Sequence, residues 1–170
     1  MSAITIRRIQ PEDNKALAII VRAALAEHKL DKPGTVFTDP TTDDLYALFD
    51  IPRAEYFVAL VDGEIAGGAG IHPLDGGEEN ICELQKMYLS PAFRGRGLAR
   101  TLIDKCLAFA SANSYTHCYL ETMPELAQAR RLYEHFGFTY LDGPMGNTGH
   151  FACDNWMLKA LSPSPDNHNG

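Results

Sequence analysis

The chain has 170 residues, of which 45% are hydrophobic and 22% charged, as in an ordinary globular domain with a real core. No apolar run is long enough to cross a membrane, and the first residues lack the apolar core of a signal peptide, so we expect a cytoplasmic protein. The formal net charge of −7 argues against a nucleic-acid partner.

The four cysteines show no CxxC spacing and lie in apolar runs, which predicts buried free thiols. They are Cys82, Cys106, Cys118 and Cys153. His150 and Cys153 have an H-x-x-C spacing, but two ligands do not make a zinc site. We therefore expect no bound metal.

The first part of the chain reads as a strand and two helices. Residues 3–9 alternate and are rich in isoleucine, which favours a strand. A helix is expected over about 11–29, where apolar residues recur on one side. Asp39 before Pro40 has the pattern of a helix cap and predicts a short helix that runs through Phe49.

Residues 55–71 have the signals of a hairpin, because two apolar runs flank Asp62-Gly63 and this pair suits a tight primed turn. Glycines in the second run predict a bulge or the close approach of another chain segment. These are Gly67, Gly68 and Gly70.

Strands and helices then alternate to the end of the chain. The expected strands are 81–89, 117–122, 138–142 and 150–161, and the expected helices are 97–111 and 124–137. The order β-α-α-β-β-β-α-β-α-β-β predicts a sheet with helices on both faces.

The segment RGRGLA, residues 94–99, joins a strand to a helix. The first N–H groups of a helix have no partner inside it and, with the helix dipole, can bind an anion. Glycines let a ligand approach the backbone, and arginines suit phosphate. The pattern indicates an anion site, most simply for a diphosphate, and the alternative is a solvated basic turn.

Two other phosphate-binding motifs fit less well. A Rossmann site expects G-x-G-x-x-G after an early strand, whereas the glycine pair here is late and Arg100 stands where the third glycine should be. A P-loop is excluded because the chain lacks its Gly-Lys-Ser/Thr run at this turn.

These residues resemble a known family. RGRGLA is similar to the acetyl-CoA signature Q/R-x-x-G-x-G/A of the GNAT superfamily of N-acetyltransferases. The segments ELQKMYLSPAFRG and LETMPELAQARRLYEHFGF also resemble its fourth strand, fifth strand and following helix. The resemblance runs from about residue 4 to 159 and is most specific over 81–138.

The resemblance implies the fold. We expect one α/β domain of the GNAT type over residues 1–160, with a mixed, mostly antiparallel sheet of about seven strands flanked by about four helices. Residues 161–170, LSPSPDNHNG, are expected to form a disordered tail.

The resemblance also implies how acetyl-CoA binds as the acyl donor. Its pyrophosphate would lie on the turn, on Arg94, Gly95, Arg96, Gly97, Leu98, Ala99 and Arg100. Its pantetheine arm would run along the backbone of Met87, Tyr88 and Leu89 like an added strand, beside a bulge that separates the fourth and fifth strands. An amide near Met87 would polarise the thioester carbonyl. The alternative for this run is a plain core strand.

Two catalytic residues follow from the same resemblance. Tyr133 matches the tyrosine that protonates the departing thiolate, although its place on an apolar helical stripe is also that of a core residue. Glu83 stands where several members carry a base that takes the proton of the amine. The alternative for Glu83 is a surface or interstrand carboxylate with no catalytic part, with ordered water as the base.

The chain departs from the family at one point. The stretch ETMPE has Met123 and no asparagine, whereas many members carry an asparagine just after the fifth strand that bonds the cofactor arm. Gln128 or backbone groups are the candidate replacements.

The expected function is therefore transfer of an acetyl group from acetyl-CoA to a primary amine by direct attack in a ternary complex. Loops at 34–49 and 144–150 are the candidate walls of the acceptor site, for a small-molecule or peptide amine. Homodimers through the last strands are common in the resembling family. The alternatives are a non-catalytic acyl-CoA sensor and a nicotinamide enzyme.

Overall fold

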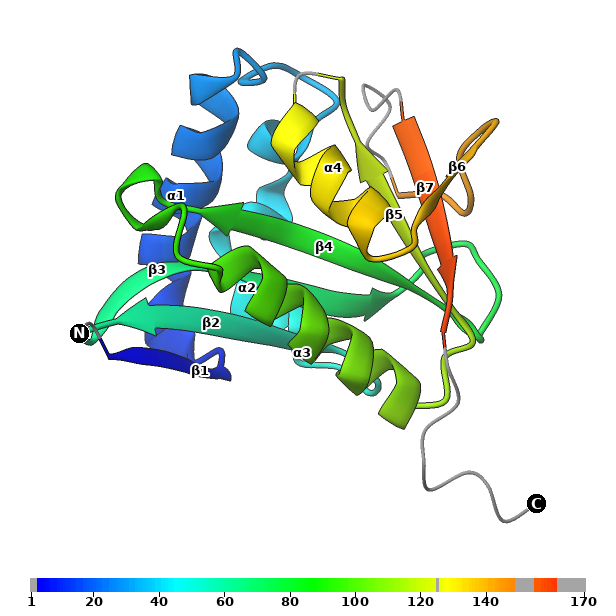
Figure 1. The fold of residues 1–170 in the computed structure, drawn as a ribbon, viewed down its shortest axis with the longest axis horizontal. Coiled ribbons are helices and arrows are strands. Elements are labelled where there is room, and N and C mark those ends of the chain that lie inside the picture. The colour runs from blue at the N-terminus through cyan, green and yellow to red at the C-terminus, as the bar shows by residue number, and fades with distance from the viewer. Residues whose placement is uncertain (1–2, 125, 149–154, 162–170) are drawn as a thin grey trace.

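The computed structural model describes residues 3–124, 126–148 and 155–161, and within them seven strands form one sheet in the order β1-β2-β3-β4-β5-β7-β6 (Figure 1). The strands are β1 (Ile4–Arg8), β2 (Glu55–Val61), β3 (Glu64–Pro73), β4 (Ile81–Leu89), β5 (His117–Thr122), β6 (Thr139–Leu141) and β7 (Asn155–Ala160). Only the β4–β5 pair is parallel among these described strands. The predicted mixed, mostly antiparallel sheet is confirmed.

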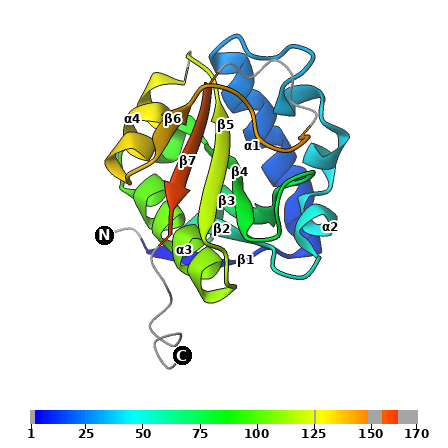
Figure 2. The same cartoon turned by 90° about the vertical axis from the view of Figure 1, so that its right-hand side faces the viewer.

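Helices cover both faces of the sheet, as predicted. They are α1 (Asn14–Glu27), α2 (Leu45–Phe49), α3 (Leu98–Ala112) and α4 (Ala127–His135). Figure 2 shows the sheet nearly edge-on, with α1 and α2 on one side and α3 and α4 on the other. Strand alternation divides the core accordingly: Tyr56 and Val58 pack with α2, whereas Ala59 and Val61 pack with α3.

The short helix predicted up to Phe49 is in fact two pieces. A 3₁₀ turn, Pro40–Asp43, is capped by Asp39, whose side chain accepts from the N–H of Thr41. Asp44 then leaves the helical region, with φ −141° and ψ 67°, and its own side chain caps α2 by accepting from Ala47. The Asp44 side chain accepts a hydrogen bond from a backbone N–H in the first turn of α2, as a helix cap does. The non-helical backbone at Asp44 therefore interrupts the predicted helix.

The other boundaries differ by a few residues. The predicted helix at 11–29 begins with a 3₁₀ turn, Pro11–Asp13, before α1. The helix predicted from Pro124 begins at Ala127, because a turn closed by Leu126 N–H on Met123 C=O comes first. Residues 150–154 of the last predicted strand, and 162–170 of the tail, lie outside the described residues.

Three of the cysteines behave as predicted. Cys82, Cys106 and Cys118 are buried free thiols, and Cys153 lies outside the described residues. Burial raises the pKa of the Cys106 thiol. The pKa of Cys118 is raised by its hydrogen bond with Cys82 and by burial. The thiols of Cys106 and Cys118 are therefore protonated at neutral pH.

The predicted turn and the glycine-rich strand are also found. Asp62 and Gly63 both have positive φ, at 52° and 82°, as a type I′ turn requires. Gly67, with φ +151°, lies so close to β4 that a Cβ there would come within 3.0 Å of Leu89 Cα and of the Tyr88 carbonyl oxygen. The close approach of β3 to β4 therefore depends on a glycine at this position.

We expect Gly67→Ala to destabilise the fold strongly, by at least about 3 kcal/mol, because it adds a backbone clash to an unfavourable φ. Guanidinium unfolding of both proteins measures the difference. Gly63→Ala is the matched control, since its φ is also positive but a Cβ there would meet nothing within 4 Å; it should cost about 1–2 kcal/mol. Equal losses for the two variants would contradict this account.

Candidate functional site

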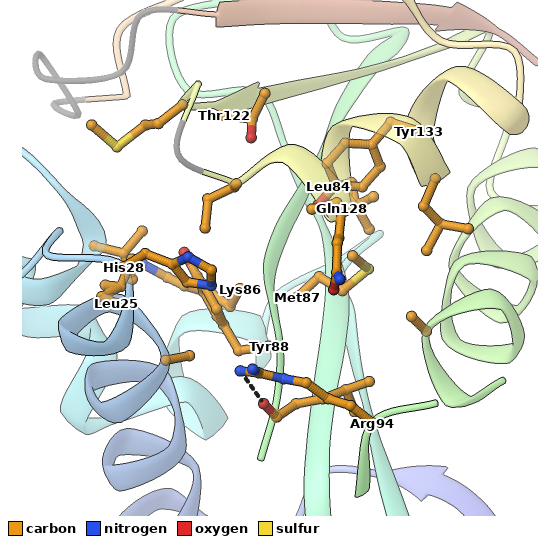
Figure 3. Close-up of a pocket in the computed structure, with 18 of the residues that line it drawn as sticks. Leu25, His28, Leu84, Lys86, Met87, Tyr88, Arg94, Thr122, Gln128 and Tyr133 are labelled. Carbon is orange, nitrogen blue, oxygen red and sulfur yellow. Dashed lines mark hydrogen bonds between the residues drawn. The ribbon is translucent and has the colours of Figure 1, made fainter. Parts of the chain in front are cut away.

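A cleft opens where β4 and β5 stop pairing. Among the described residues, β5 pairs with β4 only over Ile81–Glu83 and His117–Tyr119. Beyond that point the strands separate, and the edge of β4 from Leu84 to Leu89 lines a cleft of about 910 Å³ (Figure 3). The other walls come from α1, the start of α3, the end of β5 and α4.

A bulge in β4 accompanies this separation. The register between β3 and β4 shifts between Gly68 and Gly70, opposite Lys86 and Met87. Lys86 has a positive φ of 57°, which is uncommon for a residue other than glycine. The three residues that follow it, Met87–Leu89, are the ones predicted to bind the pantetheine arm, and all three line the cleft.

The turn before α3 has the open form that an anion site needs. Gly95 and Gly97 have φ of 78° and 77°, and a Cβ at either would meet nothing within 4 Å. No side chain caps the first N–H groups of α3, so they stay available to a ligand. Of the seven turn residues predicted to bind the cofactor, all but Arg96 line the cleft. The Arg96 guanidinium lies over the Phe93 ring, 5.6 Å from its centroid.

Arg94 links three parts of the cleft. Its guanidinium donates to Glu27 of α1 at 2.7 Å and to the carbonyl of Leu89 at 3.1 Å. The hydrogen bond from Arg94 lowers the pKa of the Glu27 carboxyl. The positive charge at the turn is thereby tied to the helix on the opposite wall.

Tyr133 reaches the cleft from α4. Its ring is buried against Phe138, with centroids 5.9 Å apart, which confirms the packing that its apolar stripe predicts. Its hydroxyl makes no hydrogen bond within the described part of the chain. Burial raises its pKa, so the hydroxyl carries its proton at neutral pH.

Glu83 lies at the closed end of the cleft, where β4 still pairs with β5. It is 2% exposed, and its carboxylate accepts from the Gln85 amide at 2.5 Å. Its register partners are His72 on β3 and Tyr119 on β5. Tyr133 and Glu83, far apart in the sequence, thus line one cleft.

The sequence did not single out Glu121, which also lines the cleft. Its carboxylate accepts from Tyr119 at 2.9 Å and from Thr148 at 2.5 Å. The Tyr119 hydroxyl in turn accepts from the N–H of Met145 at 3.2 Å. These bonds fasten the loop before residue 149, one of the predicted acceptor walls, to β5. The available signal was the alternation of β5, which puts Tyr119 and Glu121 on one face.

The other predicted acceptor wall reaches the cleft through Thr35 and Val36. Two ion pairs hold this wall in place: Asp39 pairs with Lys86 at 3.2 Å, and Asp43 pairs with Arg22. Gln128, a candidate replacement for the missing asparagine, also lines the cleft (Figure 3).

Over the residues that the structure describes, no three His, Cys, Asp or Glu side chains come together as a metal site would require. The predicted pair His150 and Cys153 lies outside those residues. The same described part of the chain contains no helix with the length and apolarity needed to span a membrane.

Comparison with known proteins settles the family. The sequence profile of the acetyltransferase (GNAT) family matches residues 22–138. This chain belongs to the GNAT acetyltransferase family. A relative, the uncharacterized N-acetyltransferase YjgM of Escherichia coli strain K12, is 45% identical over 157 residues, which are 91% of this chain and 93% of YjgM.

Solved GNAT structures share the fold. A GNAT-family acetyltransferase of Staphylococcus aureus Mu50 superposes with a TM-score of 0.84 at 18% identity, covering 94% of this chain and 100% of the other. YncA of Salmonella typhimurium, a putative acetyltransferase solved with its cofactor acetyl-CoA, gives a TM-score of 0.73 at 20% identity and 96% coverage of both chains. The predicted single GNAT fold is confirmed.

One polar atom in the cleft wall has no partner. The hydroxyl of Thr122 is buried and makes no hydrogen bond in the described part of the chain. We expect Thr122→Val to raise the melting temperature by about 2–4 °C, because it removes an unsatisfied buried group without changing the shape of the side chain.

Thr42→Val is the matched control for this prediction. Thr42 is also buried, but its hydroxyl donates to the carbonyl of Val36 at 2.8 Å, so its removal should lower the melting temperature. Scanning calorimetry of both variants gives the two signs, and a lower value for Thr122→Val would refute the prediction.

Proposed function

We propose that this protein transfers the acetyl group of acetyl-CoA to a primary amine by direct attack in a ternary complex. The observation that carries the proposal is the joining of an open strand edge, an uncapped helix start and a protonated tyrosine in one cleft. Family membership and the acetyl-CoA of the YncA structure support the donor.

The cleft fits the two ends of the donor. The backbone of the turn from Arg94 to Ala99 would hold the pyrophosphate, because its glycines leave the amides uncovered and its arginines add charge. The edge of β4 at Met87–Leu89 would pair with the amides of the pantetheine arm. The arm thereby fills the place that β5 leaves open.

Residues of the cleft are assigned to the main steps of the transfer. Glu83 takes one proton from the ammonium group, and the neutral nitrogen attacks the thioester carbonyl while the Met87 amide stabilises the charge on its oxygen. The nitrogen loses its second proton to water as the amide forms. The new C–N bond forms as the C–S bond breaks. Tyr133 gives its proton to the departing sulfur. Holding both reactants in one cleft lowers the entropic part of the barrier.

The acceptor is proposed to be a small-molecule or peptide amine that enters between α1 and the loop fastened to Glu121. We also propose a cytoplasmic location, which the three buried free thiols support. A homodimer through the last strands is proposed because β6 lies at the edge of the sheet and exposes Tyr140.

Tyr133→Phe should lower kcat by about 100-fold or more, since it removes the proton donor to the thiolate, and should change the Kd for coenzyme A less than twofold. Thiol release from acetyl-CoA, screened first against a panel of amines, peptides and aminoglycosides, measures turnover. Tyr46→Phe, on α2 and outside the cleft lining, is the control and should match the wild type. Undetectable turnover in wild type and variant alike would favour the non-catalytic sensor.

Glu83→Gln should lower kcat by about 100-fold near pH 7, where an alkylamine with a pKa of about 10 is protonated and needs a base. The deficit should narrow as the pH rises towards that pKa, because more of the amine is already neutral. A pH profile of thiol release from pH 6 to 9.5 tests this, with Glu64→Gln in the exposed β2–β3 hairpin as control. A deficit that stays constant with pH would rule out a base.

A further inference from the structure

One residue within the free edge of β4 is held in an unusual conformation. Lys86 has a φ of +57°, and the register shift between β3 and β4 lies at this point. An L-residue without a special side chain does not favour this region. Something in the surrounding structure must therefore hold it there.

One restraint acts on the backbone of Lys86. The hydroxyl of Tyr56, on β2, donates to the Lys86 carbonyl at 2.8 Å. Tyr56 is completely buried, and a Cβ at Gly68 or Gly70 would come within 3.0 Å of its ring. The glycines of β3 thus leave the space through which a tyrosine on β2 reaches the bulge on β4.

A second restraint acts on the side chain of Lys86. Its Nζ lies 3.2 Å from Asp39 Oδ2, and the side chain is 1% exposed. Figure 3 shows Lys86 on the α1 side of β4, whereas Met87 lies towards Gln128 and Tyr133. Lys86 is thereby fixed on the α1 side of β4, and the next residue, Met87, lies on the α4 side.

We propose that Tyr56 is a positioning residue for the acyl donor, acting through the carbonyl of Lys86. Its hydroxyl holds the bulge, and the bulge sets the direction of the Met87–Leu89 edge that pairs with the pantetheine arm. This inference rests on the proposed function, because it concerns that same arm. It predicts that Tyr56 affects the binding of the arm and leaves the nucleotide end of the donor untouched.

The chain contains a close match for comparison. Tyr115, also buried, donates its hydroxyl at 2.9 Å to the carbonyl of Arg53, another residue with positive φ, at 62°. Tyr115 precedes β5 and does not line the cleft. Tyr56→Phe and Tyr115→Phe therefore remove the same chemical bond, at the cleft and away from it.

Calorimetry with two ligands tests the proposal. The ligands are coenzyme A and the 3′-phosphorylated form of ADP, which keeps the phosphates but lacks the arm. Tyr56→Phe should weaken coenzyme A about five- to tenfold, as the loss of one hydrogen bond would, and change the nucleotide less than twofold. Amide hydrogen exchange should quicken in the 84–89 peptide. Tyr115→Phe should leave both affinities unchanged.

Other outcomes overturn the proposal. If wild type binds coenzyme A and Tyr56→Phe binds it equally well, the positioning role is wrong and the proposed function stands. If Tyr56→Phe weakens both ligands alike, the effect is general destabilisation. If wild type binds no coenzyme A, the proposed function fails and this inference with it. Should Tyr56→Phe not fold, Lys86→Met, which breaks the ion pair with Asp39, should weaken coenzyme A but not the nucleotide, and an equal affinity would refute the role.

Discussion

Strand β4 is paired along one side by β3, but on its other side, within the described ranges, β5 joins it only over Ile81–Glu83. Buried backbone groups in a sheet need partners, so a half-open strand is stable only where water or a ligand can reach it. The cleft is that opening. The register shift, the left-handed Lys86 and the close approach of Gly67 all serve to keep β4 attached to β3 while it turns away from β5.

Part of the cleft is positively charged although the chain as a whole is negative. The protein carries a net charge of −7, yet Arg94 and Arg100 line the end of the cleft at the start of α3. The carboxylates Glu83 and Glu121 lie towards the closed end. An anionic ligand and a cationic one are thereby favoured at opposite ends of one space, which suits a reaction between a phosphate-bearing donor and an amine.

Much of this could be predicted from the sequence because the signals are local. The alternation of β2 and β3, the Asp62-Gly63 turn and the glycines before α3 each depend on residues close together in the chain. The break at Asp44 was missed because two capping aspartates, Asp39 and Asp44, follow each other and the sequence does not say which ends a helix.

Contacts over long separations could not be predicted. Tyr56 bonds Lys86 across 30 positions and Thr148 bonds Glu121 across 27. Neither side chain differs locally from an ordinary strand or loop residue, and only the assembled sheet brings the partners together. The family resemblance named residues that recur at the site, such as Tyr133, but not those that hold the strand around it.

The reduced state of the cysteines has a consequence for a protein that liberates coenzyme A. Every turnover would release a free thiol beside the sheet, and a reactive cysteine there would be captured as a mixed disulfide under oxidising conditions. Cys82, Cys106 and Cys118 are buried, and the pKa values of Cys106 and Cys118 are raised, so these two carry no thiolate to enter such an exchange. The thiols of Cys106 and Cys118 would therefore not react with the coenzyme A that the proposed transfer releases.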